Sequence, residues 1–454
     1  MTDDPPLSAD IRYCTFSPYP LGLIRRGRPR RPAFITVKRP DRAKKIPRLR
    51  ARKSFFRCRL TCPQFPRKNL PAALLRGKAA EKRRFSMLNI DFFNPVKIIS
   101  GAGCFRSFSD YAAFGSRCLI VCGKTSARKC GALADAEASL AKAGVTYKIF
   151  DKIEQNPLIT TVYEGGRIAR DWNADFILAI GGGSPLDAGK AVAAYAANPE
   201  MQPEELFNAA RKPALPLLAV NTTAGTGSEV TPYSILTVPS IENKRSFSGD
   251  DIYAKIAFCD PTYTETLPRA FTMSTAVDAL CHAVEGYFMK KANPVSDALA
   301  EKAITLLQKG IRAVISNNLS FETRETLLYG STLAGMVISR TGTGFVHSTG
   351  YMLTYHHGIP HGQANAYFLP DFVRYMSAAA PERAARVYAL CGVADSDGLA
   401  ALLASCDDMP LDFKLTDEQC VKYADKTISA KNVEGGVRVI SRDDLLAILR
   451  SRLG

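Results

Sequence analysis

All five histidines of the 454-residue chain fall within one span of 80 residues, namely His282, His347, His356, His357 and His361. Asp278 precedes His282 by four positions in a stretch with helical periodicity, so the two side chains project from one helix face. A lone histidine is more often an ordinary core or surface residue than a functional one. The evidence for a functional site is therefore the whole group of histidines and not any single one.

His347 and His361 lie in the glycine-rich segment 342–362, where the chain can bend back on itself. One carboxylate and three imidazoles could therefore converge on a divalent cation. Imidazole and carboxylate ligands suit iron(II), zinc, nickel or cobalt, and the chemical softness of these ligands does not distinguish among the four metals. Open coordination positions at such an ion would act as a Lewis acid on an alcohol or carbonyl oxygen.

A second candidate site is a glycine cluster in the segment FILAIGGGSPLDAGK (176–190), where a strand pattern runs into a helix pattern. Glycines let the backbone approach a pyrophosphate, and a helix N-terminus stabilises its charge. The residues concerned are Gly181, Gly182, Gly183, Ser184 and Asp187. A tight turn is the alternative interpretation. The segment 221–232 follows the next strand pattern and offers Thr222, Thr223 and Thr226, so we expect both loops to bind one dinucleotide.

Strands and helices alternate in the segment that should position these loops. The expected strands are 96–100, 117–123, 146–150, 176–183 and 215–221, with amphipathic helices at 127–144 and 158–173. This alternation predicts an α/β dinucleotide-binding domain with a doubly wound parallel sheet at residues 87–270. Helical periods then take over at 275–288, 296–315, 322–339 and 381–392. They predict an all-α metal-binding domain at 271–454, with ligands in the cleft between the two domains.

The net charge of +17 is concentrated in residues 1–86, which carry +19 and 11 of the 27 prolines, whereas residues 87–454 carry −2. Such a basic, proline-rich extension cannot bury enough apolar surface to fold alone. It could be a nucleic-acid-binding arm, a transit peptide or the product of a start assigned too early, and we favour Met87 as the true first residue. Nucleic-acid binding is therefore the alternative function of another class.

The remaining composition favours a cytoplasmic protein. The twelve cysteines form no CxxC pair, which argues against zinc sites and disulfides and favours reduced, buried thiols. No stretch approaches 18 uninterrupted apolar residues and no signal peptide is evident. We expect no membrane partner.

Together the motifs resemble the iron-containing (group III) alcohol dehydrogenase family over essentially all of residues 87–454. They are GGGSPLDAGK, NTTAGTGSEVT, Asp260-Pro261, STAVDALCHAVEGY, and His347 with His361-Gly362. The resemblance implies hydride transfer between a nicotinamide and a small alcohol or aldehyde, with the metal as Lewis acid. It also implies a homo-oligomer, often a dimer.

The resemblance assigns roles to individual residues. Asp278, His282, His347 and His361 match the family's four metal ligands, usually iron(II) and sometimes zinc. Gly181 to Ser184 and Asp187 match its cofactor loop, Thr222 and Thr223 flank the nicotinamide side, and Lys244 matches a cofactor-contacting lysine.

Two departures from the family pattern affect the predicted site. Gly123 stands where many relatives have an aspartate for the adenosine ribose, and Lys124, Thr125 and Ser126 follow it, which predicts NADP(H) rather than NAD(H). Tyr351 stands where many relatives have a histidine assigned to proton relay. The candidate catalytic residues are therefore Tyr351 and, as a substitute, His357.

Two related enzymes on the same fold remain alternatives. A dehydroquinate synthase-like enzyme is disfavoured because the segment after Asp187 lacks that family's Arg-Gly. A glycerol dehydrogenase-like enzyme stays open on metal and substrate grounds.

Overall fold

The computed structural model describes residues 90–208, 210–406 and 414–454. All of these residues belong to one compact unit. The basic extension at 1–86, its nucleic-acid-binding role and the start at Met87 are predictions that lie outside the described residues.

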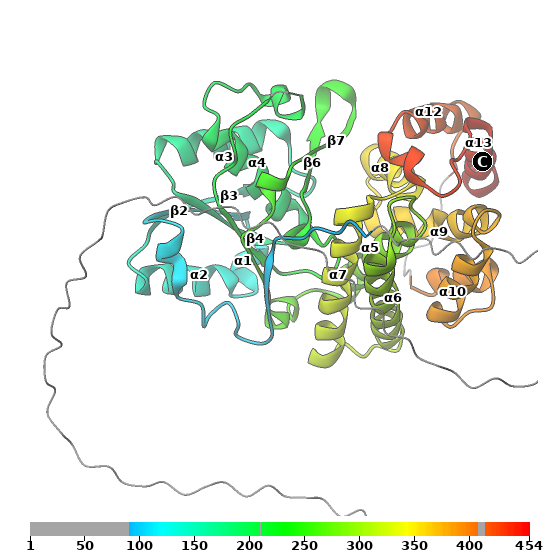
Figure 1. The fold of residues 1–454 in the computed structure, drawn as a ribbon, viewed down its shortest axis with the longest axis horizontal. Coiled ribbons are helices and arrows are strands. Elements are labelled where there is room, and N and C mark those ends of the chain that lie inside the picture. Colours follow the sequence, from blue (N-terminus) through cyan, green and yellow to red (C-terminus); the bar gives the residue numbers. More distant parts are fainter. Residues whose placement is uncertain (1–89, 209, 407–413) are drawn as a thin grey trace, which may run out of the picture. The chain divides into compact units, whose positions relative to one another are not determined.

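A six-stranded parallel sheet forms the first part of this unit (Figure 1). Its strands, in spatial order, are β1 (Lys97–Ser100), β8 (Ile256–Cys259), β5 (Leu217–Asn221), β4 (Phe176–Gly181), β2 (Arg117–Gly123) and β3 (Thr146–Ile153). Every neighbouring pair is parallel. Because parallel strands end at a common edge, the loops after β2, β4 and β5 lie together.

Helices cover both faces of the sheet, as the doubly wound prediction requires. They are α1 (Ser126–Lys129), α2 (Ala132–Lys142), α3 (Ile159–Asp171) and α4 (Gly183–Ala197). Along β2, Cys118 and Ile120 pack in one core cluster with Leu133 of α2. The alternate residues Leu119 and Val121 pack in another cluster with residues of α3 and α4. This two-residue alternation within a fully apolar strand is typical of a sheet buried on both sides.

Three strands were absent from the sequence prediction. One is β8, a four-residue strand that is completely buried. The others, β6 (Tyr233–Val238) and β7 (Asn243–Ser248), form an antiparallel hairpin of their own. The β7 sequence NKRSFS is polar apart from one phenylalanine, so it lacks the apolar alternation by which strands are recognised.

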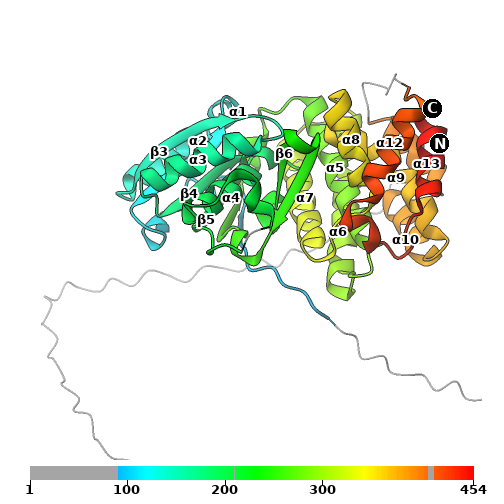
Figure 2. The ribbon, with the colours of Figure 1, turned by 90° about the horizontal axis from the view of Figure 1, so that it is seen from above.

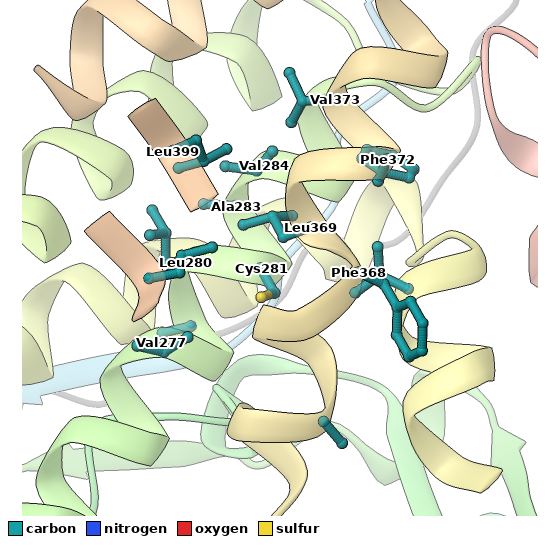
Figure 3. Packing of buried hydrophobic residues seen from close by; sticks show 14 of the residues in the cluster. Val277, Leu280, Cys281, Ala283, Val284, Phe368, Leu369, Phe372, Val373 and Leu399 are labelled. Atoms are coloured by element: carbon teal, nitrogen blue, oxygen red, sulfur yellow. The ribbon is translucent and has the colours of Figure 1, made fainter. Parts of the chain in front are cut away.

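The second part of the unit is helical, which confirms the predicted architecture of a sheet region followed by helices. Its helices are α5 (Arg269–Tyr287), α6 (Pro294–Ile315), α7 (Phe321–Thr341), α8 (Phe345–His357), α9 (His361–Ser377), α10 (Pro381–Cys391), α11 (Ser396–Ala404), α12 (Asp417–Ile428) and α13 (Arg442–Leu453). Helix α5 is buried on nearly all sides. Figure 3 shows its residues Leu280 and Val284 among Leu369 and Phe372 of α9 and Leu399 of α11.

Helix α7 packs against the sheet region through the short 3-10 helix η4 (Ser228–Val230). Figure 2 shows α7 on the side of the helices that faces the sheet region. Thr332 of α7 donates a hydrogen bond to Glu229 at 2.9 Å. A Cβ atom on Gly335 would lie 2.7 Å from the Cα of Gly227, so only two glycines allow this approach. The loop after β5 is therefore held against the helical part.

One stretch of the described chain, Pro381–Ala404, is long and apolar enough to cross a membrane. It comprises two helices, because Gly392 adopts a left-handed conformation at the end of α10 and Asp395 caps the start of α11. Val387 and Leu399 are both fully buried in the helical core. The most apolar window of this stretch is 33% buried within the protein.

Candidate active site

The four predicted metal ligands come from three helices. Asp278 and His282 lie one turn apart on α5, which is buried on that face. His347 lies in the first turn of α8, and His361 is the first residue of α9. Gly358 ends α8 with φ of +69°, a conformation that glycine adopts readily, and so turns the chain back toward the cluster.

Three of the four side chains form one cluster. Ligand atoms of Asp278, His347 and His361 all lie within 4.8 Å of one another. Asp278 Oδ1 is 3.4 Å from His347 Nε2 and 3.8 Å from His361 Nε2. The ring of His282 stacks on that of His347, with centroids 4.3 Å apart. The structure therefore gathers all four predicted ligands, with His282 in contact with the cluster through its ring.

Burial and mutual charge set the protonation of this cluster. Burial lowers the pKa of His282 to about 4 and that of His361 well below its usual value. Burial alone would raise the pKa of Asp278, but His282 and the other cluster histidines outweigh it and hold that pKa well below its usual range. At neutral pH the donors therefore include an ionised carboxylate and two neutral imidazoles, which are the forms that bind a cation.

Glu285 lies behind His347 and fixes its orientation. It is fully buried, and its Oε1 accepts hydrogen bonds from the backbone N–H groups of Gly344 (2.9 Å) and Val346 (3.0 Å). Its Oε2 pairs with His347 Nδ1. Burial alone would lower the pKa of His347, but Glu285 and Asp278 raise it to about 9. Glu285 therefore holds a proton on Nδ1, and at neutral pH the raised pKa keeps a second proton on Nε2, which a bound cation would have to displace.

Asn365 supports the cluster from α9, one turn after His361. Its Nδ2 donates to Asp278 Oδ1 at 2.8 Å and lies 3.2 Å from His361 Nε2. A Cβ atom on Gly350 would overlap the Asn365 side-chain oxygen, so α8 can pack this closely only with glycine there. Asn365 therefore fixes the carboxylate in position.

The two predicted cofactor loops lie side by side at the ends of β4 and β5. Gly181 is opposite Asn221 in the sheet, and the Thr222 N–H donates to the Gly181 carbonyl at 3.0 Å. A Cβ on Gly182 would lie 2.8 Å from Thr223, and one on Gly183 would lie 2.5 Å from Thr226. The structure brings the two loops into direct contact, and side chains on these glycines would force them apart.

Asp187 has structural partners on both carboxylate oxygens. Oδ1 accepts from Ser228 Oγ at 2.5 Å, and Oδ2 accepts from the Ile235 N–H at 2.9 Å. Lys190, one turn further along α4, donates to Ser228 Oγ at 2.8 Å and to the Tyr233 carbonyl at 2.6 Å. These contacts tie α4 to the second loop and to the β6–β7 hairpin. The contact of Asp187 with a cofactor remains a prediction.

Gly123 ends β2, and the three residues after it are exposed: Lys124, Thr125 and Ser126. A Cβ on Gly123 would lie 3.2 Å from the Ile153 carbonyl of β3 and 3.7 Å from Ser126 Oγ. This segment thus lies at the same edge of the sheet as the other two loops, with a lysine and two hydroxyls open to a ligand.

Lys244 reaches the site from β7. Its Nζ donates to Asn156 Oδ1 at 2.8 Å and lies 5.4 Å from the centre of the Tyr351 ring. Burial lowers the pKa of Lys244 to about 8, although Asp278 and Asp187 act in the opposite direction. The unpredicted hairpin therefore places a cation between the sheet loops and the histidine cluster.

Comparisons with known proteins agree with this geometry. The family model "Iron-containing alcohol dehydrogenase" matches residues 95–261, and "Fe-containing alcohol dehydrogenase family, C-terminal" matches residues 272–453. The chain is 34% identical over 327 residues to 1,3-propanediol dehydrogenase of Citrobacter freundii, covering 70% of this chain and 81% of that protein.

Another similar protein is lactaldehyde reductase of Escherichia coli (strain K12), which is 37% identical over 264 residues, or 57% of this chain and 68% of the relative. The crystal structure of an iron-containing alcohol dehydrogenase from Thermotoga maritima superimposes with a TM-score of 0.74 at 35% identity. The superposition covers 80% of this chain and 99% of the Thermotoga maritima chain.

This chain belongs to the iron-containing alcohol dehydrogenase family. The resemblance deduced from the motifs is thereby confirmed, and so is the general chemistry of an alcohol or aldehyde oxidoreductase. The matched family models span both the sheet region and the helices.

The residues of this family member fit a divalent cation. His282 Nδ1 is buried and has no hydrogen-bond partner within the described part of the chain, and His347 Nε2 has only Asp278 Oδ1, at 3.4 Å. Buried polar atoms without a partner are rare because they lose their hydration. A cation held by Asp278, His347 and His361 beside His282 would give such nitrogen lone pairs a ligand role.

The two candidate catalytic residues have different surroundings in this family member. Tyr351 stacks on His361, with ring centroids 5.0 Å apart and planes 12° apart. His357 is exposed at the end of α8, and its Nε2 pairs with the Tyr423 hydroxyl at 2.9 Å. The structure therefore brings Tyr351 to the cluster and places His357 against α12.

Sequence inspection missed three polar residues of the site: Glu285, Asn365 and Asn156. Glu285 lies seven positions after Asp278, and Asn365 lies four after His361, so helical spacing could have suggested both. Asn156 had only the turn signal of an Asn-Pro pair. Its contact with Lys244 depends on a hairpin 88 positions away in the sequence.

Proposed function

We propose that this family member is a metal-dependent, NAD(P)-linked alcohol dehydrogenase or aldehyde reductase whose metal is held by Asp278, His282, His347 and His361. The observation that carries the proposal is the buried cluster of Asp278, His347 and His361, with ligand atoms within 4.8 Å of one another. Beside the cluster, His282 Nδ1 is buried and has no hydrogen-bond partner among the described residues.

We propose iron(II) as the metal, with zinc as the alternative, since both accept imidazole and carboxylate ligands. A bound ion of either kind would act as a Lewis acid on the substrate oxygen. The chain's own contribution is to hold the ligand side chains in position. Glu285 keeps the His347 proton on Nδ1, and Asn365 orients the Asp278 carboxylate by donating to Oδ1.

The cofactor would lie across the glycine loop Gly181–Ser184 and the threonines of the neighbouring loop. The first turn of α4 contains no acidic residue, so its N-terminal N–H groups can receive a pyrophosphate without charge repulsion. Thr222 and Thr223 would contact the nicotinamide side, and Thr226 would offer a further hydroxyl to the cofactor from the same loop. Lys244, held by Asn156, provides a cation between this loop pair and the histidine cluster.

We propose NADP(H) rather than NAD(H) as the preferred cofactor. The argument is the replacement of a ribose-binding carboxylate by Gly123 and the exposure of the three residues after it. Lys124 offers a positive charge to a ribose phosphate, and Thr125 and Ser126 offer hydroxyl donors.

A cofactor-by-substrate panel tests the proposed function. The protein is stripped of metal, reloaded with iron(II) or zinc, and assayed by nicotinamide absorbance with short alcohols, diols, glycerol and small aldehydes. We expect activity only after reloading and a higher kcat/KM with NADPH than with NADH. Failure of every reloaded form on every substrate would refute the oxidoreductase mechanism, and equal efficiency with both cofactors would refute the NADP(H) preference.

Three further proposals concern the protein as a whole. We propose a homodimer, which light scattering of the purified protein would test.

We propose a cytoplasmic location, supported by the nine described cysteines, all of which are free. We also keep the division into a dinucleotide-binding domain at 87–270 and a metal-binding domain at 271–454, which separate expression of the two segments would test.

A further inference from the structure

We propose that Tyr351 is a positioning residue whose ring couples the metal ligand His361 to the cofactor-side cation Lys244. The inference rests on the proposed function, because it presupposes a metal at the histidine cluster and a dinucleotide at the glycine loops. In this proposal the aromatic ring of Tyr351 positions its neighbours. Its hydroxyl is not assigned the proton relay that its position in the sequence suggested.

Helix α8 supplies the metal ligand His347, and it also contacts the ligand His361 of α9. His347, Tyr351 and Thr354 follow each other at spacings of four and three, so they share one face of the helix. The Tyr351 ring stacks on His361, and Thr354 Oγ1 lies 3.5 Å from His361 Nδ1. One helix face thus provides one ligand and two of the contacts that orient a second.

The same tyrosine ring contacts the cation of the cofactor side. Lys244 Nζ lies 5.4 Å from the ring centre, within the range in which an aromatic face attracts an ammonium group. The Asn156 side chain accepts from Lys244, and the Asn156 N–H donates to Ser184 Oγ at 3.1 Å. A continuous series of contacts therefore joins the glycine loop at Ser184 to the metal ligand His361.

The backbone of Asn156 supports this arrangement. Asn156 has φ of +58°, a left-handed conformation that asparagine tolerates better than most residues. Its carbonyl accepts from Thr237 of β6 at 3.0 Å, so the residue that holds Lys244 is itself fixed by the hairpin that carries Lys244. The Lys244 ammonium is consequently held by two contacts, a hydrogen bond to Asn156 and the face of the Tyr351 ring.

Linkage of this kind makes two binding events depend on each other. A metal that fixes His361 restricts the stacked Tyr351 ring, and an ordered ring favours the position of Lys244 that receives the cofactor. By thermodynamic reciprocity, the cofactor must then strengthen metal binding by the same factor.

The first experiment measures zinc affinity of the metal-stripped full chain by competition with a chromophoric chelator. Tyr351→Leu removes the aromatic ring, and we expect its affinity to fall by about 10-fold to 100-fold, the usual effect of losing a partner of a metal ligand. Tyr351→Phe keeps the ring and should bind zinc like the wild type. The matched control is Tyr355→Leu, one turn further along α8, where the tyrosine contacts His356 instead of a cluster residue.

The second experiment measures coupling, by NADPH fluorescence titration with and without zinc. We expect zinc to tighten NADPH binding by about fivefold or more in the wild type, the lower end of typical coupling, and not at all in Tyr351→Leu. Lys244→Met, which leaves α8 intact, should also abolish the coupling. If Tyr351→Leu does not fold by circular dichroism, the Tyr351→Phe and Lys244→Met results decide the proposal.

The outcomes separate this inference from the proposed function. A wild-type protein that binds no metal refutes the function. If the wild type binds zinc but Tyr351→Leu binds it equally well, only the positioning role of Tyr351 is overturned. Loss of affinity in Tyr351→Phe would assign the effect to the hydroxyl and overturn the ring-stacking proposal, as would coupling that persists in Lys244→Met.

Discussion

The two sides of the site depend on different parts of the chain, the backbone on the sheet side and the side chains on the helical side. On the sheet side, Gly182 and Gly183 are needed because neighbouring threonines occupy the space that their side chains would fill. On the helical side, the buried side chains of Asp278, His347 and Glu285 make the contacts. The cofactor side therefore depends on backbone shape, whereas the metal side depends on the chemical identity of individual side chains.

This difference predicts how each side fails. A side-chain change on the metal side removes a donor, and a buried charge or imidazole loses its partner. A side-chain addition on the cofactor side pushes two loops apart without changing any donor. Metal content and cofactor affinity should thus respond to separate sets of substitutions, except at Tyr351 and Lys244, where the two sides meet.

The largest expected effect is the loss of a ligand in His361→Ala. The variant should fold but lose bound metal, and kcat should fall by about 10³-fold, since Lewis-acid stabilisation is worth several kcal/mol. Elemental analysis and steady-state kinetics measure the two effects. His356→Ala is the matched control, because His356 stacks on Tyr423 outside the ligand cluster. Full metal content in His361→Ala would contradict the ligand assignment.

A smaller effect is expected when the loops are forced apart by Gly183→Ala. The added methyl would lie 2.5 Å from Thr226 Cγ2. Overpacking of this kind costs about 1–3 kcal/mol, so NADPH affinity should fall by roughly 5-fold to 150-fold. Metal content should not change. Thr226→Ser removes the opposing methyl and should partly restore affinity in the double variant. The shape argument fails if the single variant binds NADPH normally.

Cofactor preference should respond to Gly123→Asp by about tenfold, because one carboxylate favours ribose hydroxyls and repels a ribose phosphate. The ratio of kcat/KM for NADPH to that for NADH measures this shift. An added Cβ at Gly123 would lie 3.2 Å from the Ile153 backbone carbonyl, a tight contact that requires a small local shift of the chain. Gly123→Ala controls for the backbone change. An unchanged ratio in Gly123→Asp would exclude this segment as the determinant of preference.

The smallest effect concerns pH and Lys244. With its pKa lowered to about 8 by burial, Lys244 is a cation at pH 7 and loses its proton as the pH rises through 8. NADPH affinity should therefore weaken by about threefold between pH 7 and pH 9, whereas a lysine with an ordinary pKa would stay charged. Fluorescence titration measures the change, and Lys244→Met should show a flatter profile. An unchanged wild-type affinity at pH 9 would contradict the role of Lys244 as a cofactor-side cation.

Local sequence was sufficient for the sheet loops and the histidine cluster. The glycine cluster follows a strand of six buried residues, and that pattern of apolar strand, glycines and helix can be recognised within 15 positions. The five predicted strands all exist, because each is an apolar run bounded by turn residues. The hairpin escaped prediction because the polar strand β7 is stabilised by pairing with β6 and not by an apolar pattern of its own.

The sequence by itself determined the donors, which are Asp278 and His282 one helical turn apart, two further histidines, and glycines where two loops must touch. Only the tertiary structure decided which groups support them. Glu285 and Asn365 acquire their roles from the packing of α5, α8 and α9, and Asn156 acquires its role from a hairpin distant in the sequence. The physical reason is that a donor is a property of one residue, whereas its orientation and charge depend on neighbours that only folding brings within hydrogen-bonding distance.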